Sequence, residues 1–494
     1  MTHRFVAAAM ALLAGAFLSV PGVQAQEGSE PAQVLEVGSK DGFSTISAAV
    51  AAAAPGATVI VNAGEYRETL RITVPITLEG RGWPVIDGGG GGHVIEATAD
   101  FHISGFVIRG SGIRVDSEDA GLMVRDATAS VDGNRFEDVF YGIYLKNAPG
   151  SLIRDNRIEG KPLPRPRRGD GIRLWSSSGT VVQNNRIVGT RDLVVFFSDS
   201  LEILDNHVTD GRYGLHYMYS HHNRFLRNRF ERNEVGAFIM YSTHIELRDN
   251  VFAKASGMGS MGLGLKDADE IVAEGNLFVG NEAAIYLDNS PLQRGSVNTF
   301  SRNLVLNNSV GVRLLPAVKG NRFVDNDFVD NRRPVEITGG SAGRGGTQNE
   351  WDSNHWSSYA GFDRDGDGLG DTPFVYARIA DEWVAKHPSL RIFAFSPAVQ
   401  ALDVLGRFFP LLRPRPVATD ETPRVRPARL ARWQNSPPVV TDVPTRSRLP
   451  RAAGAAAWAG LGLLALGGLG SAFRKRPTRS SNRRRAATRT KETP

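Results

Sequence analysis

The sequence predicts an all-β protein that folds as a right-handed parallel β-helix, and two internal repeats carry this prediction. An Asn-x-apolar triplet occurs nine times between Asn134 and Phe328, with most spacings close to 22 residues. Seven or eight residues after most of these triplets, a second apolar pattern begins, as at Gly142, Gly214 and Gly236. A rung of short strands with Asn or Gly at its corners cannot bury its apolar face alone, so neighbouring rungs must stack to form a core.

The repeated Asn side chains are expected to be structural. Stacked amides form hydrogen bonds along the axis of a β-helix, and Asn tolerates the backbone geometry of its corners. The predicted β-helix covers residues 26–338, and an Ala-rich helix at 44–54, ended by Pro55, should cap its first rung. Two longer spacings indicate insertions at 160–168 and 254–261.

Both ends of the chain carry the patterns of targeting segments. Residues 1–25 have a positively charged start, an apolar run and a small-x-small cleavage site, which predict a secretory signal peptide. Residues 452–473 contain no charge and are long enough to cross a bilayer as a helix, and the basic tail 474–494 follows at once. The positive-inside rule then places the tail in the cytoplasm and the β-helix across the membrane from it, although a discarded sorting tail would show the same pattern. Residues 413–451, rich in Pro and Arg, predict a semi-extended tether and not a domain.

Composition excludes several kinds of function. The chain of 494 residues has no cysteine, which excludes disulfides, thiolate nucleophiles and thiolate metal sites. Its formal net charge of +6 comes from the predicted tether and tail, because residues 27–412 alone carry a net charge of about −9. Nucleic-acid binding by that acidic body is therefore not expected.

An acidic loop lies in the predicted C-terminal cap, residues 339–412. Its oxygen donors have the spacing of an EF-hand calcium loop, and they are Asp363, Asp365, Asp367, the carbonyl of Leu369, and Asp371. Phe374 stands where such a loop ends in Glu, so another group must close the coordination shell. We expect a structural Ca²⁺ that folds residues 351–376, with Trp351 and Trp356, over the open end of the β-helix. A plain polar turn is the alternative.

The same cap contains the pattern of an amphipathic helix between Pro397 and Pro410. The apolar side chains of this segment include Phe395, Val399, Leu402, Leu405, Phe408 and Phe409. Two interpretations stay open: the segment packs along the flank of the β-helix, or it docks against the extracytoplasmic face of a transporter and the membrane surface.

Four stretches of the chain together resemble the NosD-type proteins. They are TISAAVAAAAPGATVIVNAGEYRETLRITVPITLEG, the 22-residue Asn rungs, GLHYMYSHHN followed by AFIMYS, and NHWSSYAGFDRDGDGLGDTPF. The first two occur in many carbohydrate-binding and sugar-hydrolase β-helices, and the last two are more specific. The resemblance covers roughly residues 30–412.

The resemblance implies a function without catalysis. NosD-type proteins are periplasmic maturation factors for the copper sites of nitrous oxide reductase, and they work beside an ABC transporter. The implied partners are therefore the permease and ATPase of an ABC transporter, nitrous oxide reductase, and a copper-donating lipoprotein. The implied location is the periplasm, where the C-terminal helix would anchor the protein to the inner membrane. Cu(I), bound transiently, is the expected cargo.

Polysaccharide lyases and uronate epimerases with a β-helix fold are the competing class. Such enzymes need a base, a proton donor and a cationic group against the substrate carboxylate. In related uronate epimerases, the equivalent of Tyr213 leads into an Asp-Pro-His run, whereas this chain has His216, Tyr217 and Met218 there. The catalytic set is incomplete and the acidic body would repel a polyanion, so no enzymatic activity is predicted. A structural surface stalk without metal dependence is a third class.

Counting along the second strand of each rung predicts which side chains face the solvent. The first and third positions after Gly214 and its equivalents are apolar in nearly every rung, so the second and fourth positions must face outward. In the central rungs these outward positions include Trp175, Phe196, His216, Met218, Phe238 and Met240. Because stacked rungs are about 4.8 Å apart, His216, Met218 and Met240 could converge on one ion. Thioether and imidazole ligands suit Cu(I) better than zinc or calcium.

Other roles for this surface stay open. His221, His222, Met258 and Met261 lie on neighbouring turns and are candidate secondary ligands. The rings of Trp175, Phe196 and Phe238 could instead form a docking surface for a partner protein. Alternatively, an insertion such as 254–261 could cover the surface as ordinary core, with Met as a gap filler.

Overall fold

The computed structural model describes residues 33–257, 259–338, 348–378, 387–393, 396–399, 401 and 416–434. The predicted signal peptide, membrane-spanning helix and basic tail lie outside these residues. Within the described part of the chain, no helix is long and apolar enough to cross a membrane.

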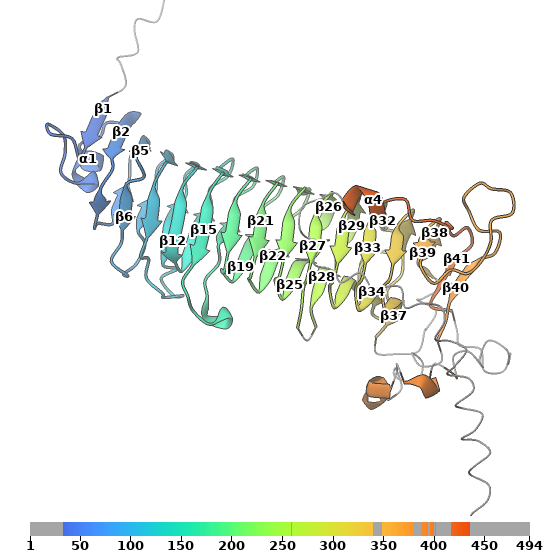
Figure 1. The fold of residues 1–494 in the computed structure, drawn as a ribbon. Coiled ribbons are helices and arrows are strands. Elements are labelled where there is room, and N and C mark those ends of the chain that lie inside the picture. Colours follow the sequence, from blue (N-terminus) through green and yellow to red (C-terminus); the bar gives the residue numbers. More distant parts are fainter. Residues whose placement is uncertain are drawn as a thin grey trace, which may run out of the picture. The chain divides into compact units, whose positions relative to one another are not determined.

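Three parallel sheets stack turn upon turn as a right-handed β-helix of about 13 turns, which confirms the predicted fold (Figure 1). Sheet A consists of β1 (Val34–Val37), β2 (Ala57–Asn62), β5 (Ile76–Arg81), β8 (Phe101–Ser104), β11 (Ala129–Asp132), β14 (Leu152–Arg154), β17 (Val181–Gln183), β20 (Glu202–Leu204), β23 (Arg224–Leu226), β26 (Thr243–Arg248), β29 (Asp269–Glu274), β32 (Asn298–Ser301), β35 (Asn321–Val324) and β38 (Glu350–Asp352). Sheet B consists of β3 (Glu65–Tyr66), β6 (Val85–Asp87), β9 (Val107–Arg109), β12 (Arg135–Val139), β15 (Arg157–Gly160), β18 (Arg186–Val188), β21 (His207–Thr209), β24 (Arg229–Glu231), β27 (Val251–Ala253), β30 (Leu277–Val279), β33 (Leu304–Leu306), β36 (Asp327–Val329) and β39 (His355–Trp356). Sheet C consists of β4 (Leu70–Ile72), β7 (Ile95–Ala97), β10 (Ala120–Arg125), β13 (Tyr141–Lys146), β16 (Ile172–Trp175), β19 (Asp192–Phe196), β22 (Tyr213–Met218), β25 (Val235–Met240), β28 (Met261–Lys266), β31 (Ala283–Asp288), β34 (Val310–Leu314) and β37 (Arg333–Ile337).

A ladder of buried Asn side chains joins successive turns, as the repeat predicts. The main-chain N–H and the Nδ2 of Asn206 both donate to Oδ1 of Asn228 at 3.0 Å, and Nδ2 also donates to the carbonyl oxygen of Val182 at 2.8 Å. The ladder runs through Asn134, Asn156, Asn185, Asn206, Asn228, Asn250, Asn276, Asn303, Asn326 and Asn354. These amides supply partners to buried backbone groups at a corner where no strand can do so.

The interior is filled by apolar side chains that repeat from turn to turn. Phe230 stacks on Phe252 with ring centroids 5.5 Å apart, and Phe252 stacks on Phe278 at 4.9 Å. All three rings are fully buried. A residue in this column therefore contacts its own equivalent in the next turn, which explains why the repeat keeps large apolar residues there.

Helix α1 (Ile46–Ala52) covers the first turn, where the Ala-rich run predicts a cap. The helix begins after Thr45, whose hydroxyl accepts a hydrogen bond from the N–H of Ala48 at 3.2 Å. Its buried face, formed by Ile46, Ala49 and Val50, belongs to the main core. This packing covers the apolar end that the first rung would otherwise expose.

Aromatic rings close the opposite end of the stack. Trp351 stacks on Phe323 at 4.2 Å, and Trp356 stacks on Phe328 at 4.4 Å. Phe374, in β40 (Phe374–Tyr376), adds a further ring at 4.5 Å from Trp356. Both tryptophans thus extend the core columns of the preceding turns, in the position expected for a C-terminal cap.

Residues 416–434 lie within the predicted semi-extended tether, 413–451, and they differ from that prediction because they contain secondary structure. They contain β41 (Ala418–Asp420), which pairs with β40 antiparallel, and α4 (Leu430–Gln434). We call residues 416–434 the strap. The prediction failed because the strap has no apolar periodicity. Val417 and Ala418 join the main core, and hydrogen bonds and ion pairs of Asp and Arg side chains add to the attachment.

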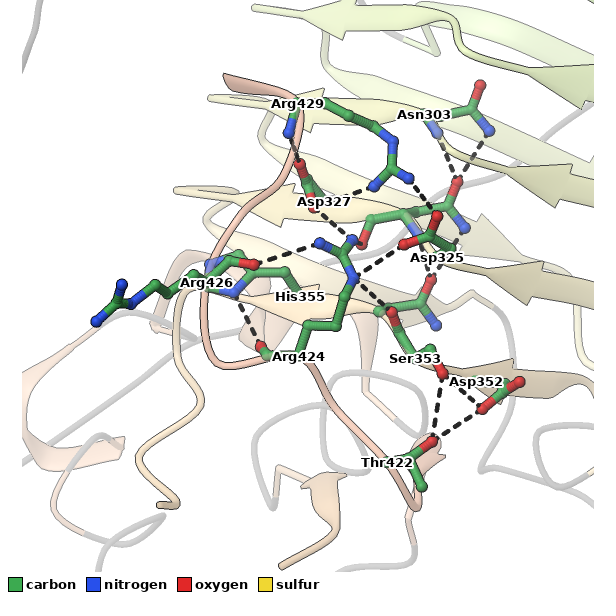
Figure 2. Close-up of polar contacts among 12 residues, drawn as sticks. Asn303, Asp325, Asp327, Asp352, Ser353, His355, Thr422, Arg424, Arg426 and Arg429 are labelled. Atoms are coloured by element: carbon green, nitrogen blue, oxygen red, sulfur yellow. Dashed lines mark hydrogen bonds and ion pairs between the residues drawn. The ribbon is translucent and has the colours of Figure 1, made fainter. Parts of the chain in front are cut away.

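Two strap arginines pair with two aspartates of the penultimate turn (Figure 2). Arg424 contacts Asp327 at 2.6 Å and Asp325 at 3.0 Å. The N–H of Arg429 donates to Asp327 at 2.6 Å, and its guanidinium pairs with Asp325. The side chain of Asp327 is fully buried, so these contacts replace water around a buried carboxylate.

A buried acid of sheet B gives the fold a defined response to low pH. The pKa of Glu231 is lowered to about 2 by the imidazole of His207, whose Nε2 lies 3.5 Å from the carboxylate, and, against the cost of burial, by the charges of Arg232 and Arg229. The folded state prefers the ionised carboxylate, so Glu231 stabilises the protein at pH values above the ordinary pKa of a glutamate. This contribution to stability is lost as the pH falls towards 2. We expect Glu231→Gln to cost about 2–3 kcal/mol at pH 7 and almost nothing near pH 2. Urea unfolding of the wild type and of Glu231→Gln between pH 2 and pH 7 measures this loss of stability. A difference in stability that does not change with pH would contradict the prediction.

Candidate functional site

The outward side chains of four sheet C strands, β16, β19, β22 and β25, form one continuous surface. We call this surface the soft-ligand patch, and its members are Trp175, Phe196, His216, Met218, Phe238 and Met240. Strand pairing places Phe196, Met218 and Met240 side by side in one column, and His216 next to Phe238 in the neighbouring column. The register agrees with the alternation expected from the sequence, since Leu215 and Tyr217 are fully buried between them.

The patch is only partly accessible. Met240 is 9% exposed, whereas Met218, Phe196 and Phe238 are half-buried. Of the two thioethers, Met218 is therefore the one that a ligand reaches first. Met240 is the strand partner of Met218 in the next turn, and the two backbones are about 4.8 Å apart along the axis.

His216 is oriented by a buried carboxylate. Its Nδ1 lies 3.3 Å from Oδ2 of Asp192, and its ring meets the rings of Phe196 and Tyr213 edge-on, with centroids 5.0 and 4.9 Å away. A carboxylate that holds one ring nitrogen of a histidine leaves the other nitrogen for a metal ion and sets the ring's direction. The hydrogen bond and the ring contacts of His216 are made with these groups, and its convergence with the two methionines on one ion stays a prediction.

Two buried aspartates and three arginines form the network behind His216. Asp170 accepts hydrogen bonds from Arg173 and Arg191 at 3.0 Å. Asp192 accepts a hydrogen bond from Nε of Arg212 at 3.0 Å and lies 3.6 Å from Arg191. Both carboxylates are fully buried, so no polymeric substrate can contact them. The network therefore orients His216 and does not form an acid–base pair open to a polysaccharide.

The two acids differ in their affinity for protons. Burial raises the pKa of Asp170 in spite of the neighbouring Arg191 and Arg173. Burial also acts to raise the pKa of Asp192, but its hydrogen bonds with His216 and Arg212 hold it below the ordinary value. Asp192 is therefore ionised and able to hold the Nδ1 proton of His216.

The insertion at 160–168 borders the patch. Leu163 packs against the cluster that contains Tyr144, which is buried although it occupies an outward position. Arg165, in the 3₁₀ turn η1 (Arg165–Arg167), pairs with Glu234 at 2.8 Å. Tyr144 is therefore covered next to this insertion, whereas Trp175 stays partly accessible at the border of the patch.

Sequence reasoning missed a second set of aromatic side chains beside the patch. Phe197, Tyr219 and Tyr241 follow the outward column in three consecutive turns, and their rings stack at 5.5 and 4.9 Å. Phe197 is 46% and Tyr219 43% exposed. The sequence contains a pattern that could have predicted them, because an aromatic residue directly follows each of Phe196, Met218 and Met240. The aromatic surface is therefore larger than the alternation of the strands alone predicts.

The predicted secondary ligands are spread around the patch. Nδ1 of His221 accepts a hydrogen bond from the N–H of Thr243 at 3.1 Å, which ties this side chain into the corner after β22. His222 is exposed at the same corner, Met261 begins β28 beside Val235, and Met258 lies outside the described residues. None of the described contacts joins these residues to Met218 or Met240.

The acidic loop brings three of its five predicted oxygen ligands together. Carboxylate oxygens of Asp363, Asp365 and Asp367 lie within 4.8 Å of one another, while Asp371 accepts a hydrogen bond from the N–H of Arg364 instead. The donors are all oxygens, as Ca²⁺ prefers. Leu369 faces the strap across an isolated β-bridge, and the neighbouring Gly368 carbonyl accepts from Val425 at 3.1 Å.

The predicted docking helix is described only in part. Residues 397–399 are helical and Val399 is half-buried. Phe395, Leu402, Leu405, Phe408 and Phe409 lie outside the described residues.

Comparisons with known proteins agree on one family. A family model described as "Periplasmic copper-binding protein (NosD)" matches residues 155–361, which include the whole soft-ligand patch. The chain is 28% identical over 396 residues to the "Probable ABC transporter binding protein NosD" of Pseudomonas aeruginosa, a match that covers 74% of this chain and 87% of the relative. It is 26% identical over 385 residues to the protein of the same name from Stutzerimonas stutzeri, covering 71% and 83%.

Solved structures of similar fold include an epimerase and a glucanase. The A-module of the Azotobacter vinelandii mannuronan C-5 epimerase AlgE6 aligns with a TM-score of 0.48 and 15% identity, over 63% of this chain and 93% of that module. The catalytic domain of a GH87 α-1,3-glucanase aligns with a TM-score of 0.44 and 13% identity, over 67% of this chain and 70% of that domain.

The two sequence relatives are named as transporter binding proteins and not as enzymes, in line with the prediction from the incomplete catalytic set. Their matches extend over most of the chain and far beyond the repeated Asn rungs. The family model and both relatives therefore agree with the resemblance to NosD-type proteins that the sequence motifs indicate.

Proposed function

We propose that this protein is a periplasmic accessory protein that works with an ABC transporter to assemble the copper site of nitrous oxide reductase. The soft-ligand patch is the observation that supports the proposal most directly. It combines two thioethers and one oriented imidazole on a partly accessible surface, within the segment that matches a copper-binding family. A cysteine-free chain can offer Cu(I) no thiolate, so Met and His are its soft ligands.

The patch suits transient binding of copper as cargo. Two thioethers and one imidazole bind Cu(I) without thiolate, and the half-buried position of Met218 keeps the ion within reach of a partner. The aromatic side chains around it, including Phe197 and Tyr219, give an apolar surface on which a partner protein can dock. Nitrous oxide reductase and a copper-donating lipoprotein are the proposed partners at this surface.

We expect the triple variant His216→Ala, Met218→Ala, Met240→Ala to bind Cu(I) at least about tenfold more weakly than the wild type, because each substitution removes a ligand. The measurement is competition with a chromophoric Cu(I) chelator under anaerobic conditions. Replacement of Tyr286, an outward residue of β31 away from the patch, by Ala is the matched control. Equal affinity in the folded triple variant would remove copper binding from the patch and leave a docking surface.

The attachment to the transporter and the membrane forms the second part of the proposal. Residues 452–473 would anchor the protein to the inner membrane, and residues 395–409 would dock on the permease. Co-purification of the permease with the full chain, compared with a chain that lacks residues 395–409, tests the docking segment. Equal recovery of the permease with both folded chains would contradict it.

A Ca²⁺ ion in the acidic loop is proposed to stabilise the C-terminal cap. Since the loop is hydrogen-bonded to the strap, loss of the ion should loosen both. We expect a chelator to lower the melting temperature of the wild type and to leave that of Asp363→Asn, Asp365→Asn unchanged. A wild-type melting temperature that does not respond to the chelator would contradict the proposal.

A further inference from the structure

A column of possible metal ligands lies at the corner between sheets C and A, outside the soft-ligand patch. Strand pairing makes His222, His244 and Glu270 equivalent residues of three consecutive turns. All three have left-handed backbone conformations, with φ of 56°, 57° and 55°, and all three are exposed. Their side chains therefore leave three equivalent points of the solenoid, about 4.8 Å apart, and project into solvent.

The side chains of this column already contact one another. The imidazoles of His222 and His244 have centroids 4.4 Å apart with planes inclined by 33°. Nε2 of His244 pairs with Oε2 of Glu270. His244 thus has a second imidazole on one side and a carboxylate on the other, whereas the donor atoms of all three residues do not lie within 4.8 Å of one another.

The surroundings of the column would not repel a cation. The equivalent residue one turn before His222 is Ser200, and the equivalent residue one turn after Glu270 is Val297. Neither carries a charge. The carboxylate of Glu270 leaves the column with a negative charge while the imidazoles are neutral.

We infer that His222, His244 and Glu270 form a binding site for a divalent transition-metal ion of the kind that prefers imidazole, represented by Zn²⁺. A nitrogen–nitrogen–oxygen donor set is typical of Zn²⁺ and unlike the thioether set of the patch, which suits a monovalent soft ion. The ion would enter between Nε2 of His244 and the carboxylate of Glu270, and the exposed side chain of His222 would turn to supply the third ligand. Solvent completes the coordination, because the column is exposed on its outer side.

The test is calorimetric titration of the full chain with Zn²⁺, in detergent and with excess Ca²⁺ present to occupy the acidic loop. The variants are His222→Asn, His244→Asn and Glu270→Gln, because Asn tolerates the left-handed backbone at these corners. We expect each His variant to bind at least about tenfold more weakly than the wild type, because each lacks one ligand. Circular dichroism confirms that the variants are folded.

His207→Asn is the matched control. His207 also faces a glutamate, with Nε2 3.5 Å from Glu231, but no histidine pairs with it in sheet B. Unchanged Zn²⁺ affinity in this control together with weakened binding in His222→Asn and His244→Asn supports the site. Wild-type affinity in His244→Asn, or an equal loss in His207→Asn, overturns it. Because the patch variants are assayed with Cu(I), a failure here leaves the proposed function untouched.

Discussion

Replacement of Asp420 by Ala is expected to lower the free energy of unfolding by about 3 kcal/mol or more. Oδ2 of this buried carboxylate accepts hydrogen bonds from the main-chain N–H of Asn354 at 2.9 Å, from its Nδ2 at 3.0 Å, and from Nε1 of Trp356 at 3.0 Å. Oδ1 accepts from the N–H of Ser353 at 3.1 Å. Alanine removes the acceptor of the two main-chain N–H groups, of one side-chain N–H of Asn354 and of the indole N–H, and each such loss costs about 1–3 kcal/mol. Urea unfolding of the full chain measures the change.

The neighbouring Glu421→Ala serves as the control for this experiment. Glu421 is exposed, so its loss should change stability by no more than about 0.5 kcal/mol. If Asp420→Ala unfolds at the same urea concentration as Glu421→Ala, the strap does not hold the end of the ladder. A change confined to the protease sensitivity of the strap would contradict the prediction equally, because the effect is expected on the whole cooperative unit.

Substitution of Asn228, which lies in the middle of the stack, by Leu should lower the free energy of unfolding by a similarly large amount. Oδ1 of Asn228 accepts from the N–H and the Nδ2 of Asn206, both at 3.0 Å, and Nδ2 donates to the carbonyl of Ile203 at 2.7 Å. Leucine has a similar size but leaves the main-chain N–H of Asn206, one of the two N–H groups of its Nδ2 and the carbonyl of Ile203 without these partners, for a loss of about 3–5 kcal/mol. The measurement is again the free energy of unfolding in urea.

Gln183→Leu is the control for the ladder substitution. Gln183 also exchanges an amide for an apolar side chain, but it lies half-exposed on β17. Its replacement should cost less than about 0.5 kcal/mol. A loss as large as that of Asn228→Leu would mean that the amide-to-leucine exchange itself, and not the ladder, destabilises the protein.

The β-helix could be predicted because its repeat consists of residues that are seldom buried at constant spacing in other folds. A buried Asn at constant spacing, such as Asn206 and Asn228, satisfies backbone groups only when turns stack. The outward register of His216 and Met218 was predictable for the same reason, since a shift by one residue would expose Leu215. The alternation of apolar residues along a strand therefore predicted which side chains form the core and on which face of the sheet the patch lies.

Contacts that depend on side-chain direction could not be predicted. The strand register shifts between Asp192 and Val194, and His216 hydrogen-bonds to Asp192, a contact that the alternation along the strand does not indicate. Met240 is buried because neighbouring side chains cover it, which alternation cannot reveal. The chemistry of a site depends on such details even when its location follows from the repeat.

The strap could not be predicted because its attachment has no repeat. Arg424 and Arg429 pair with Asp325 and Asp327 about a hundred residues earlier in the chain. In the sequence, a run rich in Pro and Arg has the composition of a solvated linker. Only the buried acids of the last turns, which no local pattern distinguishes from surface acids, show that the linker folds back.

The Asn ladder also has an electrical direction. In each of its steps the main-chain N–H and one side-chain N–H of an Asn point towards the C-terminal end of the stack, and the amide oxygen of the next Asn points towards the start, as between Asn303 and Asn326. Aligned peptide dipoles give an α-helix a partial positive charge at one terminus, and the aligned side-chain amides should do the same at the last turn. Asp420 places a negative charge at that pole. A neutral acceptor such as Asn could continue the ladder there, but an anion ends it and balances the accumulated dipole.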